Sequence, residues 1–157
     1  MIKRKCQRCQ GETATTVIGT AEGEAKPLAI AISGMPVLAC PRGHRQFVDN
    51  GFPRRLLERL LKEDAEVLPA GRETGMIFKH YHCGNCGSEL APGPDHRQTF
   101  EVDVLLEDLA PFKVALTMPV YRCPHCEQEQ IHSRKEIMKQ TPQALAQAFQ
   151  AAEIPPA

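Results

Sequence analysis

Residues 35–44 read MPVLACPRGH, and residues 118–127 read MPVYRCPHCE. The phrase Met-Pro-Val, followed two residues later by Cys-Pro, therefore occurs twice, about half a chain apart. The second copy continues to another cysteine, Cys126, whereas the first copy has a histidine, His44, one position later than that cysteine would stand. We interpret each copy as the closing part of a metal site, and the repetition as a tandem repeat of one zinc-binding module.

An earlier Cys-x2-Cys pair precedes each copy, CQRC at 6–9 and CGNC at 83–86. Two thiolates three residues apart in a tight turn can face one ion, and a hairpin can bring a second such turn alongside. In the first half His44 replaces the missing fourth cysteine, because an imidazole reaches further than a thiolate. The predicted metal ligands, which include all seven cysteines, are Cys6, Cys9, Cys40 and His44 for one zinc ion, and Cys83, Cys86, Cys123 and Cys126 for the other.

Glycine and proline in these turns fit the same interpretation. Gly84 lies inside one opening pair, Gly87 directly follows it, and Gly11 comes two residues after the other. Glycine there permits a positive φ and a close approach of amides to sulfur. Pro41 and Pro124 follow the leading cysteine of each closing turn, where proline presets φ.

The spacing leaves alternatives open. Iron in the four-cysteine site, as in rubredoxin, is one of them. Another is that His44 is an ordinary surface histidine, and that His80, His82 or a water is the fourth ligand of the first site. An exchangeable water would make that site a candidate catalytic zinc. We expect the remaining histidines at the surface: His96, His125 and His132.

The composition points to an intracellular globular protein. The chain has 157 residues, 19 acidic and 19 basic side chains, and 42% hydrophobic residues, so its net charge gives no general attraction to nucleic acid. It lacks a stretch of about 18 apolar residues, and no apolar run follows the basic N-terminus, so we expect neither a membrane span nor a secretory signal. The odd number of cysteines also favours metal ligands in a reducing cytoplasm over disulfides.

Two strand-like runs lie between the cysteine turns of each half, and we predict strands at 13–20, 27–33, 99–106 and 112–118, with short final strands at 38–39 and 121–122. The run from Phe100 to Leu106 alternates, with Val102 and Val104 on the apolar face and acidic residues on the other, as in a half-buried strand. GTAEGE (19–24) and EDLAP (107–111) are predicted to be the turns between paired strands.

Helices are predicted after each closing turn. FPRRLLERLLKEDAEV (52–67) has leucines at helical spacing, with Pro53 in its first turn, and we expect it to cover the sheet or to meet its counterpart from the other half. Ser133 and Glu136 form a capping box that predicts a short helix through Lys139. Thr141 with Pro142 predicts a second helix that runs to about residue 152.

These elements predict a small α+β protein of two zinc-ribbon modules, each a short antiparallel sheet followed by helix. The first module with its amphipathic helix covers residues 1–67, a linker covers 68–78, and the second module with the C-terminal helices covers 79–157.

At GMPVLACP (34–41) and TMPVYRCP (117–124) each half resembles the zinc ribbon of the YgiT/MqsA-type zinc finger family. This resemblance implies zinc binding by the seven cysteines, while His44 departs from the family's cysteine. Antitoxins of that family bind DNA through a C-terminal helix-turn-helix. QTPQALAQAF (140–149) is only a little like its first helix, and the chain ends before a recognition helix could form.

Our functional hypothesis is a non-enzymatic, cytoplasmic protein with two structural Zn²⁺ ions and a protein partner, with a homodimer as one possible form. The alternative is an antitoxin-like or other nucleic-acid-binding regulator, because basic residues gather near the first site: Lys3, Arg4, Lys5, Arg8, Arg42 and Arg45. A zinc enzyme with an open first site is the third hypothesis.

Overall fold

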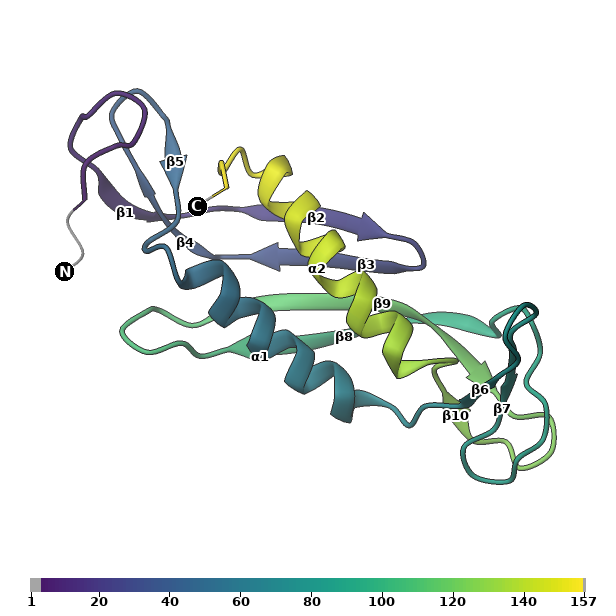
Figure 1. The fold of residues 1–157 in the computed structure, drawn as a ribbon. Helices are drawn as coiled ribbons and strands as arrows, with labels where there is room; N and C mark the ends of the chain where they lie inside the picture. Colours follow the sequence, from purple (N-terminus) through teal and green to yellow (C-terminus); the bar gives the residue numbers. More distant parts are fainter. Residues whose placement is uncertain (1–3, 157) are drawn as a thin grey trace.

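The computed structural model describes residues 4–156, and it describes side chains throughout this range except at 63–67. Both helices lie on one face of an antiparallel sheet (Figure 1), which confirms the predicted α+β class. The elements in chain order are β1 (Ala14–Val17), β2 (Thr20–Ala25), β3 (Leu28–Ser33), β4 (Pro36–Ala39), β5 (Arg45–Gln46), α1 (Phe52–Val67), β6 (Arg72–Thr74), β7 (His80–His82), β8 (His96–Val104), β9 (Phe112–Arg122), β10 (Glu129–Gln130) and α2 (Arg134–Ala151).

The central sheet contains strands from both halves of the chain. Its order is β10-β9-β3-β2, and β8 also pairs with β9. The β2–β3 hairpin of the first half and the β8–β9 hairpin of the second join through antiparallel β3 and β9. We expected a short sheet of its own in each half. The hairpins share one sheet instead, because a lone hairpin buries too little surface to be stable. Strands β1, β4 and β5 form a smaller sheet beside the first cysteine turns.

The join between the hairpins is symmetric with respect to the sequence repeat. Met35 and Met118 stand 83 positions apart, as do all other equivalent residues of the repeated phrase. With this offset Ala115 is the equivalent of Ile32, and Val114 is the equivalent of Ala31. Ala31 pairs with Ala115 and Ile32 with Val114, so exchanging the two halves leaves the ladder unchanged. Shifting α1 by the same 83 positions gives 135–150, which lies within α2.

Each helix covers the hairpin of the other half. Helix α2 packs against β2 and β3, whereas α1 packs against β8 and against α2. One hydrophobic cluster contains fully buried residues from both halves, among them Ile30, Ile32, Leu56, Leu60, Val114, Leu116, Ala144 and Ala148. The segment 68–78, expected to be a linker, contains β6, and its Ala70 bridges to Ile131. The division of the chain into 1–67 and 79–157 stays a prediction.

One predicted turn is wrong. GTAEGE was expected between two strands, but residues 20–25 form β2, and the hairpin reverses at 26–27. Gly23 suggested a turn, but it lies within β2, where it is needed for packing. A Cβ at this position would collide with the backbone of Ala144 and Ala148, so the glycine lets α2 lie directly on the strand.

The two predicted C-terminal helices are one helix, α2. Ser133 caps it as predicted, because the Glu136 amide donates to Ser133 Oγ at 3.3 Å. Pro142 lies inside the helix, where it cannot donate to the carbonyl one turn earlier. The Thr141 hydroxyl donates to the Ile137 carbonyl at 2.6 Å, and burial of the helix face against the sheet outweighs the missing bond.

Other predicted elements are confirmed. Helix α1 has the expected bounds, with Pro53 in its first turn and Leu56 and Leu60 buried. Strand β8 buries Val102 and Val104 and exposes the acidic residues between and before them. EDLAP lies in the turn between β8 and β9. Neither helix, as far as the structure describes them, is long and apolar enough to cross a membrane.

Candidate metal centres

The cysteine turns gather into two clusters, one at each end of the molecule (Figure 1). In the first, the turn at 6–9 meets the turn at 40–44, and in the second, the turn at 83–86 meets the turn at 123–126. Within each cluster the four candidate donor atoms lie within 4.8 Å of one another. The structure thus brings the eight predicted ligands together in the two predicted groups: Cys6, Cys9, Cys40 and His44, and Cys83, Cys86, Cys123 and Cys126.

The separations between donor atoms fit a tetrahedral ion. In the first cluster Cys9 Sγ lies 3.7 Å from Cys40 Sγ, and Cys6 Sγ lies 3.6 Å from His44 Nδ1. In the second, Cys86 Sγ lies 3.5 Å from Cys123 Sγ, and Cys83 Sγ lies 3.6 Å from Cys126 Sγ. Bonds of about 2.3 Å to sulfur and about 2.0 Å to nitrogen place tetrahedral donors about 3.8 Å apart for two sulfurs and about 3.5 Å for sulfur and nitrogen. Both clusters could therefore hold a metal ion.

The three Cys-x2-Cys turns share one backbone conformation. The residue after the second cysteine has a positive φ in each of them: 63° at Gln10, 80° at Gly87 and 66° at Glu127. Its amide donates to the carbonyl of the first cysteine at 2.9 to 3.0 Å. The left-handed residue reverses the chain, so that both thiols of a turn face the same point. Only one of these three positions is a glycine, which explains why glycine alone is an incomplete signal for the turn.

The turn that contains His44 is one residue shorter. Gly43 takes the left-handed conformation, with a φ of 85°, and its amide donates to the Cys40 carbonyl at 2.9 Å. The Cys40 amide then donates to the His44 carbonyl at 3.1 Å, as the Cys6 amide donates to the Gly11 carbonyl. His44 is therefore the equivalent of Gly11 in the opening turn: each lies on the segment that returns from its turn. From there only a side chain longer than cysteine reaches the cluster, and this accounts for a histidine one position late.

A buried glutamine supports each cluster. Oε1 of Gln130 accepts from the Gly84 amide at 3.0 Å, and its Nε2 donates to Cys83 Sγ at 3.2 Å. Oε1 of Gln46 accepts from the Gln7 amide at 3.0 Å in the same relation to Cys6. These glutamines come from β10 and β5, the short strands after each closing turn, and were not predicted. The signal was available, because a glutamine follows Cys40 by six residues and Cys123 by seven, which matches the shorter first turn.

Hydrogen bonds to sulfur prepare two thiols for ionisation. Burial opposes the charge on Cys83, but the Gln130 side chain and the amides of Cys86 and Asn85 outweigh it and lower the thiol pKa to about 6. Burial likewise opposes the charge on Cys6, and nearby backbone amides with the thiol of Cys9 and His44 lower its pKa to about 6. Each cluster thus offers a thiolate, the form that binds metal, near neutral pH.

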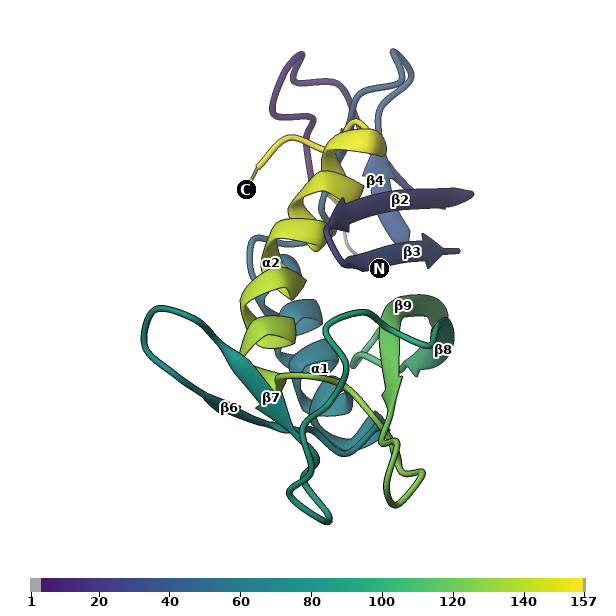
Figure 2. The same cartoon turned by 90° about the vertical axis from the view of Figure 1, so that its right-hand side faces the viewer.

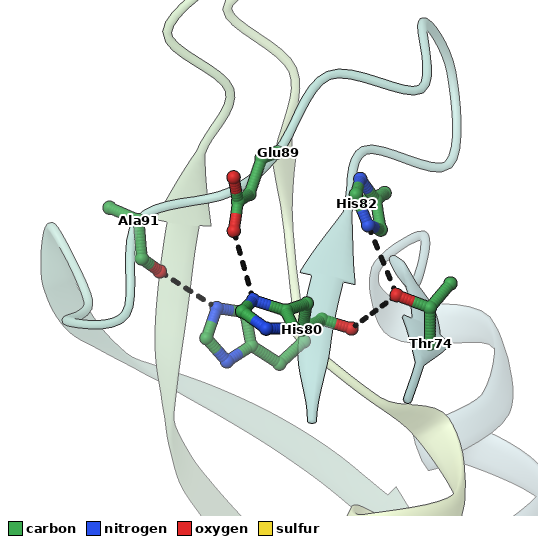
Figure 3. A network of polar contacts seen from close by, with 6 residues as sticks. Thr74, His80, His82, Glu89 and Ala91 are labelled. Carbon is green, nitrogen blue, oxygen red and sulfur yellow. Dashed lines mark hydrogen bonds and ion pairs between the residues drawn. The ribbon is translucent and has the colours of Figure 1, made fainter. Parts of the chain in front are cut away.

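The histidines of β7 do not belong to the first cluster. His80 and His82 lie near the second cluster, at the other end of the molecule, so the alternative that either completes the first site is wrong. His80 Nδ1 lies 3.1 Å from a Glu89 carboxylate oxygen, and His82 Nε2 lies 3.1 Å from Thr74 Oγ1 (Figure 3). These contacts tie β7 to its neighbours.

His132 is not a surface histidine as expected. Its half-buried ring stacks between Tyr81 and Tyr121, with ring centroids 4.2 and 3.3 Å away, and its Nε2 lies 3.1 Å from the Ala91 carbonyl oxygen. Burial lowers its pKa, so the ring is neutral near pH 7. His96 and His125 are exposed, as predicted.

Several basic side chains predicted near the first site lie around it. Lys5, Arg8 and Arg42 are exposed on its turns. Arg45 instead donates to the Ala152 carbonyl at 2.8 Å, which attaches the end of α2 to this cluster. Lys3 lies outside the described residues.

Comparison of the chain with protein-family models, with curated proteins and with solved structures gives no match.

Proposed function

We propose that the chain is a non-enzymatic protein-interaction module, built from two related zinc ribbons and stabilised by two structural Zn²⁺ ions. The observation that carries the proposal is the closure of both clusters, because four protein donors in each leave no coordination position for a water or a substrate. A bound ion at each end would fix turns that are far apart in the sequence, and its binding energy would contribute directly to folding.

The symmetry of the fold supports the tandem-repeat part of this proposal. The β3–β9 ladder is unchanged when the halves are exchanged, and matching glutamines contact matching opening turns. A relation of each half to the YgiT/MqsA-type ribbon belongs to the same proposal and rests on the repeated phrase. We also propose a cytoplasmic location, since free thiols bind zinc in a reducing compartment.

Elemental analysis of freshly purified protein tests the metal assignment. We expect two zinc ions per chain in the wild type and about one in His44→Ala and in Cys126→Ala. His125→Ala is a matched control, because His125 is exposed within the second closing turn, and it should retain two. One zinc per chain, unchanged by His44→Ala, would contradict a closed first site.

Exposed Lys5, Arg8 and Arg42 support a second candidate function, which is binding to nucleic acid at the first cluster. Such binding should weaken steeply with salt, because phosphate contacts release counterions. Titration with labelled duplex and single-stranded oligonucleotides at low and moderate salt checks it, and no binding at low salt would exclude it.

A further inference from the structure

The β6–β7 hairpin carries the most exposed large hydrophobic side chains of the described residues. Met76, Ile77 and Phe78 form its tip and are 99%, 86% and 79% exposed. Three consecutive apolar side chains in water are costly, and such exposure marks interaction sites. Figure 2 shows that the hairpin projects away from the body of the protein, on the side where the helices lie.

The base of this hairpin is well held. Thr74 pairs with His80 and Arg72 with His82, and the Lys79 ammonium lies 3.2 Å from a Glu73 carboxylate oxygen. The Leu90 amide donates to the Tyr81 carbonyl at 2.8 Å, which ties β7 to the opening turn of the second cluster. The tip is therefore presented by an ordered support, so little conformational entropy is lost when it binds.

A groove of mainly apolar lining lies between the two helices and the C-terminal segment. Its volume is about 450 Å³, and its walls include Phe47, Pro53, Leu57, Leu145, Phe149 and Ile154. It is formed by the first half of α1, the second half of α2 and residues 154–156, near the first cluster. The groove lies between the two helices, which pack against the sheet with their other side. Figure 2 shows the β6–β7 hairpin on the same side of the sheet as the helices.

We propose that the hairpin tip of one chain docks in the helix groove of a second copy, and that the contact is reciprocal. The tip and the groove lie at opposite ends of one face. Two copies can pack with these faces toward each other and their long directions reversed, related by a twofold axis. Each tip then lies over the groove of the other copy. The inference rests on the proposed role as an interaction module and names its partner.

Area and charge favour a second copy as the occupant. Three side chains of this size bury on the order of 500 Å². With the matching groove walls and the second contact, the total reaches roughly 2,000 Å², the size of a stable interface. A lipid surface fits less well. The Lys79 ammonium beside the tip is paired with the Glu73 carboxylate, so its charge is already balanced.

The test is the mass of the zinc-loaded 157-residue chain by analytical ultracentrifugation over a range of concentrations. We expect a dimer for the wild type. The tip variant Ile77→Ser/Phe78→Ser and the groove variant Ala146→Glu should each raise the dimer dissociation constant roughly 100-fold or more. Ala146 is exposed and lines the groove, so a glutamate there blocks the groove and leaves the core intact. Leu105→Ser is the matched control, since Leu105 is 67% exposed elsewhere, and it should stay dimeric.

Two further readings keep the result unambiguous. Zinc content measured on each variant separates a lost contact from a lost metal site, so failure of the dimer and failure of the zinc proposal are told apart. Mixing the tip variant with the groove variant should restore part of the dimer mass, because one of the two contacts is then intact. A monomeric wild type at high concentration, or a dimer that both variants leave unchanged, would overturn the proposal.

Discussion

Nε2 of Gln130 donates a hydrogen bond of 3.2 Å to Sγ of Cys83, although Gln130 is not itself a candidate metal ligand. Because the same side chain accepts from the Gly84 amide, it sets both the position and the charge of the first ligand of the second cluster. Partners of this kind hold a ligand in place and tune its basicity.

Replacing Gln130 by methionine should therefore weaken zinc binding at the second site about 10- to 100-fold and leave the first site unchanged. Competition with a chromophoric chelator measures both affinities. Gln46→Met serves as the comparison at the first site: Gln46 accepts from the Gln7 amide, but its Nε2 donates to the Lys5 carbonyl and not to sulfur, so we expect a smaller loss of affinity there. Equal affinities in the variant and the wild type would show that the glutamines only fill space.

Gly23 should not tolerate a side chain. Alanine at this position forces α2 away from β2, because its Cβ would collide with the helix backbone. We expect Gly23→Ala to lower the free energy of unfolding by about 1–3 kcal/mol or more. Chemical denaturation of the zinc-loaded protein measures this. A Cβ at Gly19 meets nothing within 4 Å, so Gly19→Ala should change stability little. Similar unfolding midpoints for the two variants would argue against the close packing of α2.

The exchange of helices between the halves predicts that neither half folds alone. Residues 1–67 lack the helix that covers β2 and β3, and residues 79–157 lack the helix that packs on β8. Each fragment with zinc should form its metal turns but give a poorly dispersed amide spectrum, and mixing the two should restore dispersion. A well-dispersed spectrum and cooperative unfolding for either fragment alone would contradict the shared core.

Much of the local structure could be predicted because the signal is local. The spacing of the cysteines sets each turn, the leucine period sets α1, and the alternation from Phe100 to Leu106 sets the buried face of β8. Ser133 caps α2 for the same reason.

The remainder depends on contacts between distant segments. The alternation of apolar residues in β3 and β9 does not specify that these two strands pair, because it would fit any antiparallel neighbour. Gly23 is typical of a turn, but the packing of α2 places it in a strand. Pro142 is typical of a helix start, but the burial of α2 places it inside a helix. Gln46 and Gln130 are polar residues whose burial follows only from the turns that they contact.

Acid should destabilise the protein through His132. Burial lowers the folded-state pKa of this imidazole below its ordinary value of 6.5, so the folded state binds the proton more weakly than the unfolded state does. The full stability is present above about pH 6.5 and is lost as the pH falls through the folded-state pKa. Urea unfolding between pH 7.5 and pH 5 should show a steeper loss for the wild type than for His132→Phe, which keeps the stack but cannot titrate. Parallel curves would contradict this role.

X-ray absorption at the zinc edge tests the central claim most directly, because it counts the atoms bound to the metal in the intact protein. Two closed sites together have seven sulfur donors and one nitrogen donor, so the averaged spectrum should show this ratio, with Zn–S near 2.3 Å and Zn–N near 2.0 Å. His44→Ala should remove the nitrogen contribution. A light-atom donor that persists in His44→Ala, or an iron edge in place of zinc, would contradict two closed structural zinc sites.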